Sequence, residues 1–158
     1  PGQITMIPSY LILAKLGLIN SLWGLVIFSA VDAFGIFMLR QFCETLPNEL
    51  LDAARIDGAG ELRTFLQMVL PLCRAALLTL AIFTFMGAWN DFMWPLIILS
   101  DSRNYTLPVA LANLSGEHVQ DTELMMAGSV VTILPALLVF LLFQRAYVRG
   151  IMAGGVKE

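Results

Sequence analysis

Three long apolar stretches of nearly uncharged sequence constrain this chain more than any other feature. They cover residues 21–39, 75–99 and 124–143; the first two carry one Asp each and the third carries no charge. A helix rises about 1.5 Å per residue, so about 20 residues cross a hydrocarbon core of about 30 Å. Lipid offers no partner to free backbone groups, so helices are the expected spanning element. The stretches therefore predict membrane-spanning helices.

The composition agrees with this prediction. Of the 158 residues, 58% are hydrophobic and 13% are charged, whereas soluble domains average about half apolar and about a quarter charged. A further apolar run over residues 4–18 predicts the end of another spanning helix. The chain starts at Pro1 inside that run, without a charged leader, so we interpret it as an N-terminally truncated fragment. The predicted fold class is an all-α, polytopic transmembrane helical bundle, with a kink at Pro135.

Lys and Arg are distributed unequally between the two sides that these helices would separate. Seven of these residues lie within or next to segment 44–72, which separates the first two long apolar stretches, or follow the last stretch. The other two, Lys15 and Arg103, lie in the other loops. Cytoplasmic loops carry the excess of Lys and Arg in membrane proteins. We therefore expect segment 44–72 and the C-terminus to face the cytoplasm, and loop 100–122 to face outward. The seven are Arg40, Arg55, Arg63, Arg74, Arg145, Arg149 and Lys157.

A charged, helix-favouring stretch, NELLDAARIDGAGELRTFLQMVLPL, occupies residues 48–72 between two apolar runs. Asp57–Gly58 predicts the end of a first helix, because glycine suits the left-handed position that closes helices. A second helix is expected from near Gly60 to Pro71, with apolar residues at helical spacing. The pattern leaves two interpretations open. One is an ordinary cytoplasmic loop whose second helix lies on the membrane, and the other is a knob that docks into a groove of a partner.

This stretch resembles the signature loop of ABC-importer permeases. That loop is usually written Glu-Ala-Ala, three residues and Gly, with Leu-Pro further along, and here Asp52-Ala53-Ala54, Gly58 and Leu70-Pro71 match it. Asp52 replaces the usual Glu and is shorter by one methylene. The flanks FGIFMLRQF, WNDFMWPLI, YTLPVAL and QRAYVRGIMAGGVKE resemble the carbohydrate branch, the maltose and glycerol-phosphate type. The resemblance covers essentially the whole chain.

The resemblance implies a permease subunit of an ATP-driven sugar importer in a bacterial-type inner membrane. Its implied partners are an ATP-binding subunit, a second permease subunit, an extracytoplasmic solute-binding protein, the sugar and the lipid bilayer. Segment 44–72 would be the coupling loop that sits in a cleft of the ATP-hydrolysing subunit. No G-x-x-x-x-G-K-[ST] motif occurs here, so ATP hydrolysis is expected on the partner. The implied coupling residues are Glu49, Asp52, Ala53, Ala54, Asp57, Gly58 and Ala59.

Three polar residues within the apolar stretches are candidates for the translocation pathway. Asp32 falls near the middle of its stretch, where a charge costs about 2.5–3.5 kcal/mol on insertion scales. It would line the pathway or pair with another helix, or else be a protonated group that holds the bundle together. Asn90 and Asp91 lie between Trp89 and Trp94 and would contact sugar hydroxyls, or else cap a helix broken at Pro95.

Other functional classes find less support. Cys43 and Cys73 are interpreted as isolated thiols, and His118 as a surface residue, so we expect no metal, no cofactor and no catalytic site. No basic patch suits nucleic acid. A permease of an ABC importer for another solute remains a near alternative, because the coupling loop is shared across substrates. A proton-coupled secondary transporter would use Asp32 as a relay but would not need the hairpin.

Overall fold

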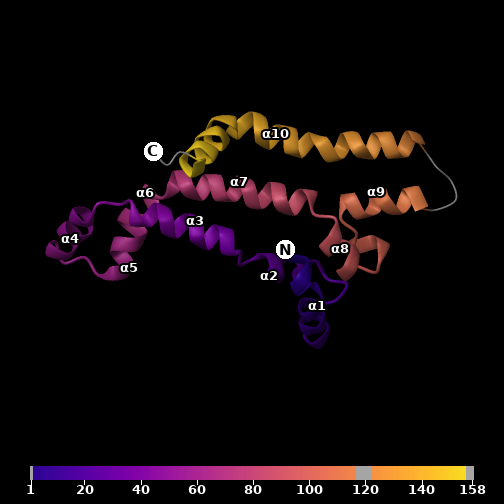
Figure 1. Cartoon of the computed structure of the whole chain (residues 1–158), viewed down its shortest axis with the longest axis horizontal. Helices are drawn as coiled ribbons and strands as arrows, with labels where there is room; N and C mark the ends of the chain where they lie inside the picture. The colour runs from indigo at the N-terminus through magenta and orange to yellow at the C-terminus, as the bar shows by residue number, and fades with distance from the viewer. Residues whose placement is uncertain (1, 117–121, 156–158) are drawn as a thin grey trace. The chain divides into compact units, whose positions relative to one another are not determined.

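The computed structural model describes residues 2–116 and 122–155. Every regular element in these ranges is a helix, and they contain no strand, which confirms the all-α prediction (Figure 1). The chain divides into two compact units, Pro1–Val31 with Phe85–Leu142, and Asp32–Thr84 with Phe143–Glu158. Helices α7 and α10 run from one unit into the other. The prediction for His118 lies outside the described residues.

The first unit packs around a small apolar cluster. Leu13, Trp94, Ile98 and Leu99 are buried together, and the ring of Phe28 lies 4.6 Å from that of Trp94 between centroids. This cluster holds the short helices of the unit against each other. The first unit comprises η1 (Gly2–Thr5), α1 (Met6–Lys15), α2 (Leu22–Ser29), the end of α7 (Arg74–Asn90), α8 (Met93–Ile98), η3 (Ser102–Asn104), α9 (Leu107–Gly116) and most of α10 (Thr122–Gly155).

Asn20 joins two distant segments of the first unit. It has a positive φ of 57°, and its side-chain oxygen accepts hydrogen bonds from the backbone N–H groups of Ser100 and Asp101, both at 3.0 Å. Its backbone carbonyl accepts one from the side chain of Asn104 at 2.9 Å. Arg103 in turn donates to the Asp101 carboxylate and thereby lowers the pKa of Asp101. One Asn therefore orders the turn between α8 and η3.

Replacing Asn20 by Ala should destabilise the first unit by roughly 2–4 kcal/mol, because two hydrogen bonds are lost and Ala disfavours a positive φ. The thermal midpoint of the purified, detergent-solubilised protein measures this loss. Asn20→Asp is the matched control, since it keeps the acceptor and tolerates the backbone conformation. An unchanged midpoint for Asn20→Ala would contradict a structural role for the side chain.

The second unit is built on two helices and the hairpin that joins them. Helix α3 and the start of α7 lie side by side (Figure 1), and their contacts run in opposite order along the two helices. The rings of Phe34 and Phe83 meet edge to face at 6.0 Å, and the thiols of Cys43 and Cys73 meet further along. The two helices are therefore antiparallel. The unit comprises α3 (Ala33–Glu44), α4 (Asn48–Ile56), α5 (Glu61–Thr64), a π-helical turn η2 (Phe65–Val69), α6 (Leu70–Leu72), and parts of α7 and α10.

A buried glycine lies at the contact between these two helices. A Cβ placed on Gly35 would lie 3.1 Å from Cδ1 of Leu80, which is tighter than ordinary van der Waals contact. Small residues let helix backbones approach closely where packing, not water exclusion, drives association in a membrane. A side chain at position 35 would therefore require the side chain of Leu80 on α7 to shift.

The membrane-crossing helices differ in detail from the sequence prediction. By length and composition, Leu22–Glu44 and Thr122–Gln144 could each cross a membrane, and Glu61–Leu72 with Arg74–Asn90 would make a third span with a 71° bend. The helix expected over 21–39 is interrupted between α2 and α3, and the one expected over 75–99 is interrupted between α7 and α8. The run over 4–18 contains the short helix α1. Helix α10 continues through Pro135.

Candidate functional site

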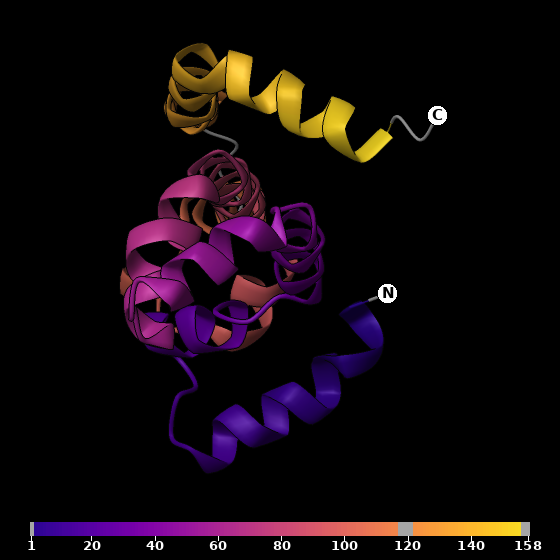
Figure 2. The same ribbon diagram turned by 90° about the vertical axis from the view of Figure 1, so that its left-hand side faces the viewer.

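The hairpin between α4 and α5 turns at a glycine elbow. Gly58 has a φ of +75°, as the Asp57–Gly58 pair predicted. The N–H of Gly58 donates to the carbonyl of Arg55 at 3.0 Å, and that of Ala59 donates to Ala54 at 2.9 Å. This pair of bonds is a Schellman motif, which satisfies carbonyls at a helix end. Figure 1 shows the hairpin beyond the C-terminal end of α3, and Figure 2 views this end of the unit from the front.

The inner side of the hairpin is packed by small residues. Ala54 and Thr64 are both buried, and the Thr64 hydroxyl donates to the carbonyl of Gly60 at 3.2 Å. Ala54 is among the residues that the resemblance implies at a partner interface, and within this chain it is buried. Its backbone carbonyl accepts the hydrogen bond from Ala59 that helps to close the elbow.

Arg55 connects the two arms of the hairpin by ion pairs. Its guanidinium lies 3.3 Å from the Asp52 carboxylate on α4 and 3.5 Å from the Glu61 carboxylate at the start of α5. All three side chains are exposed, so the pairs contribute little to stability. The shorter carboxylate of Asp52 still reaches Arg55, so the departure from the usual Glu leaves this contact intact.

The two most exposed large apolar side chains of the hairpin lie near its elbow. Ile56, next to the elbow, is 86% exposed, and Leu62 on α5 is 71% exposed. Neither was predicted as a site residue, although an isoleucine between Arg55 and Asp57 is unusual for a solvated turn. Isolated exposed apolar residues are common, but a group of them at one place indicates an interaction surface.

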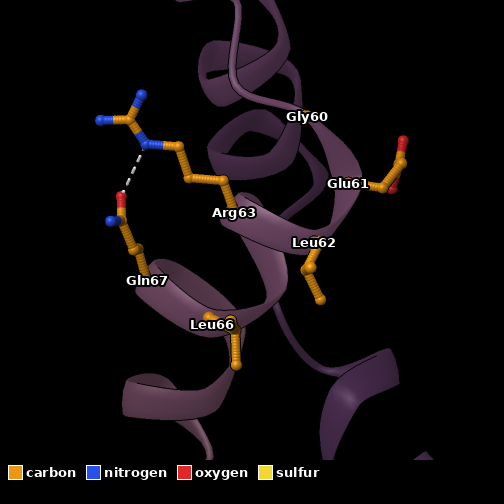
Figure 3. A pocket seen from close by; sticks show the side chains of 6 residues that line it. All are labelled: Gly60, Glu61, Leu62, Arg63, Leu66 and Gln67. Atoms are coloured by element: carbon orange, nitrogen blue, oxygen red, sulfur yellow. Dashed lines mark hydrogen bonds between the residues drawn. The ribbon is translucent and has the colours of Figure 1, made fainter.

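A shallow hollow adjoins Leu62. Figure 3 shows that Leu62 and Leu66 point to the same side of the helix, while Arg63 donates to Gln67 at 3.0 Å on another side. The apolar hollow therefore has a polar margin. It is lined by Gly60, Glu61, Leu62, Arg63, Leu66 and Gln67.

The outer side of the hairpin combines these apolar groups with negative charge. Within residues 48–67 there are four carboxylates against two guanidinium groups. We call the following residues the elbow surface, all of them exposed except the half-buried Ala59: Glu49, Asp52, Ala53, Ile56, Asp57, Gly58, Ala59, Glu61 and Leu62.

The position of Asp32 in the sequence suggested a place inside one continuous helix, but the structure places it between two helices. Helix α2 ends at Ser29, and Asp32 is the N-cap of α3, where its carboxylate accepts a hydrogen bond from the N–H of Gly35 at 3.2 Å. The side chain is exposed in this chain. A carboxylate at this position satisfies an N–H that the helix itself leaves free.

Asn90 and Asp91 also make local hydrogen bonds. The Asn90 amide donates to the carbonyl of Met86 at 2.8 Å, and the Asp91 carboxylate accepts from the N–H of Trp94 at 3.4 Å. The break between α7 and α8 falls after Asn90, not at Pro95, which lies within α8. Asp91 thus accepts a hydrogen bond from the first turn of α8, whereas the Asn90 amide bonds within its own helix.

The two cysteines are not isolated, contrary to the sequence interpretation. Their sulfur atoms lie 3.5 Å apart, with Cys73 buried and Cys43 exposed. The sequence separation of thirty residues concealed the contact, which depends on the antiparallel pairing of α3 with α7. Among the described residues, no group of three or more His, Cys, Asp or Glu could hold a metal ion.

The architecture defines a multi-pass α-helical membrane protein with a charged helix–elbow–helix segment between two of its apolar helices. Residues 1–153 match the model of the family described as binding-protein-dependent transport system inner membrane component. The chain belongs to this family of transport permeases, which confirms the resemblance of its signature loop.

The chain is similar to curated permease proteins of two transport systems. The chain is 38% identical over 157 residues to the arabinooligosaccharides transport system permease protein AraQ of Halalkalibacterium halodurans, covering 99% of this chain and 56% of the relative. It is 40% identical over 154 residues to the sn-glycerol-3-phosphate transport system permease protein UgpE of Pectobacterium atrosepticum, covering 96% and 55%. The chain thus spans about half the length of the curated relatives it matches.

A solved structure shares the fold. The crystal structure of a bacterial ABC transporter involved in the import of the acidic polysaccharide alginate contains a chain that matches with a TM-score of 0.67 and 25% identity. The match covers 96% of this chain and 56% of that chain. This similarity confirms that the helices belong to an ABC-transporter permease fold.

Proposed function

We propose that this chain is a membrane-spanning part of the permease of an ATP-driven sugar importer. Its apolar helices would contribute to the translocation pathway, and the elbow surface would dock into a separate ATP-hydrolysing subunit. A second permease subunit and an extracytoplasmic solute-binding protein would complete the transporter. Relatives that transport arabinooligosaccharides and glycerol phosphate support the carbohydrate assignment.

One observation carries the docking part of this proposal, namely the exposed Ile56 at the tip of a charged hairpin. The exposed apolar side chains of Thr122–Gln144 on α10 lie in a helix long and apolar enough to cross a membrane, where an apolar surface is expected. Ile56 lies among charged residues beyond the end of α3 and needs another cover. A groove in a soluble partner would cover it, and apolar anchors of this kind dominate binding energies.

The charge of the elbow surface indicates the chemistry of that groove. Glu49, Asp52, Asp57 and Glu61 outnumber the basic residues around them. A groove with a basic rim and an apolar floor would match both the carboxylates and Ile56. Complementary potentials of this kind guide association and fix orientation.

Reconstituted transport tests the proposed function. The full-length permease, assembled with its ATPase subunit in liposomes, should take up sugar only when ATP and the solute-binding protein are supplied. Uptake driven by a proton gradient without ATP would contradict the proposal and favour a secondary transporter. ATP-dependent uptake of a different solute would retain the coupling mechanism and overturn the sugar assignment.

The proposed orientation gives a labelling prediction. In a Cys73→Ser background, Cys43 should react with a membrane-impermeant maleimide only from the cytoplasmic side, because basic residues gather there. A cysteine introduced in loop 100–122 by Ser102→Cys, in a variant that also lacks Cys43, should react only from outside. Mass spectrometry of labelled vesicles measures both, and the reversed pattern would contradict cytoplasmic docking of the hairpin.

Asp32 remains a candidate pathway residue, and its capping bond allows a sharper test. Asp32→Leu should impair uptake and lower stability by about 1 kcal/mol through the lost cap. Asp32→Asn keeps an acceptor for the Gly35 N–H but removes the charge, so it should impair uptake without lowering the thermal midpoint. Both variants should assemble. Normal uptake by Asp32→Asn would show that Asp32 serves only as a cap.

A further inference from the structure

The contact between Cys43 and Cys73 lies at both ends of the coupling segment. Cys43 is in the last turn of α3, immediately before residues 44–72, and Cys73 follows them directly. Cys73 also occupies the 71° bend between the helix of Glu61–Leu72 and α7. The two thiols therefore meet where the hairpin joins its two supporting helices.

The geometry of the pair suits reversible covalent bonding. The sulfur atoms lie 3.5 Å apart, whereas a disulfide requires about 2.05 Å. Rotation of the side chains and a small approach of the helices would close that gap. Two thiols without a third ligand nearby do not form a metal site in the described residues.

We propose that Cys43 and Cys73 form a reversible oxidation site that ties together the two ends of the hairpin. Exposed Cys43 reacts first: its thiolate attacks one oxygen of hydrogen peroxide, the O–O bond breaks, and a sulfenic acid forms. The released hydroxide takes up the proton that the Cys43 thiol gave up and leaves as the first water. The sulfur of Cys73 then displaces the sulfenic oxygen, which leaves as a second water. Two thiols are oxidised to one disulfide and one peroxide is reduced to two waters, so atoms and electrons balance.

The consequence for transport rests on the proposed function. If the ATPase subunit moves the hairpin, motion reaches α3 and α7 through residues 44 and 72. A disulfide between Cys43 and Cys73 removes independent motion of these two attachment points and holds the bend at Cys73. Uptake should therefore fall while ATP binding to the partner persists.

The experiment uses the assembled transporter in liposomes, treated with hydrogen peroxide and then with dithiothreitol. Peptide mapping without reductant should show Cys43 linked to Cys73, with the linked peptides two hydrogens lighter than their sum. Uptake should fall about tenfold, in the range of coupling free energies between sites, and recover on reduction. Cys43→Ser is the main control, because its side chain is exposed and the variant should fold; its uptake should resist peroxide.

Three outcomes would overturn the inference. They are failure of the linked peptide to form, a linked peptide with unchanged uptake, and equal loss of uptake in Cys43→Ser. ATP-dependent uptake by liposomes that have not received peroxide tests the proposed function separately. The linked peptide can be detected whether or not uptake occurs. Cys73→Ala provides a second control that removes the disulfide through the buried partner.

Discussion

Gly58→Val is expected to abolish most of the uptake per ATP hydrolysed while leaving membrane insertion intact. The φ of Gly58 is +75°, a conformation that costs a residue with a Cβ roughly 1–2 kcal/mol and more when the side chain is β-branched. No atom lies within 4 Å of a Cβ built at this position, so the strain arises in the backbone alone. Relief of that strain would break the Schellman bonds and redirect α5.

Two variants separate the causes of this effect. Gly58→Asn adds a larger group than hydrogen but tolerates the left-handed conformation, so it should retain coupling if backbone conformation is decisive. Gly60→Val places the same side chain two residues away, where φ is −69° and the space is open, and should also retain it. ATPase rate and uptake are measured on the same liposomes. Normal uptake per ATP in Gly58→Val would show that the elbow is only a connector.

The sequence predicted those parts of the fold that local chemistry determines. Apolar runs of spanning length predicted helices, and the Asp57–Gly58 pair predicted the elbow, because a single residue type satisfies a left-handed helix end. These features depend on neighbours within a few positions. The sequence therefore predicted the helical state of the apolar runs and the elbow, but not the breaks after Ser29 and Asn90 that interrupt two of these runs.

The remaining features depend on contacts between distant residues. Asn20 adopts its positive φ because the segment from Ser100 to Asn104 supplies its hydrogen-bond partners. The break before Asp32 contains no Gly or Pro. The one local signal for it is the polar side chain of Asp32 itself, which caps α3. Nothing in the local sequence states which residues pack against these groups.

The predictions for the candidate site divide in the same way between local features and contacts of distant residues. The resemblance supplied the position of the elbow, but not which of its side chains face outward. Ala54 is buried and Ile56 is exposed, although they lie only two positions apart on α4. The contact of Cys43 with Cys73 required the antiparallel register of α3 and α7, which the sequence pattern did not define.

Replacing Ile56 by Ala should weaken binding of the ATPase subunit more than any other apolar truncation on the hairpin. Ile56 is 86% exposed and packs little within its own chain, so the variant should fold and insert normally. A buried apolar anchor is worth about 1–3 kcal/mol when truncated at an interface, or roughly fivefold to 150-fold in the dissociation constant. Titration of the ATPase subunit onto liposomes that contain the permease measures this change.

The matched control is Ile133→Ala on α10. Ile133 is 60% exposed, but it belongs to the apolar span of Thr122–Gln144, which a soluble subunit would not reach, so its truncation should leave ATPase binding unchanged. Ile56→Asp extends the test, because a carboxylate placed in an apolar floor adds desolvation to the lost contact. It should bind more weakly than Ile56→Ala and reduce uptake in proportion. Equal affinity for Ile56→Ala, Ile56→Asp and the unmodified permease would mean that Ile56 stays in water when the ATPase binds, and that the elbow surface is not where it docks.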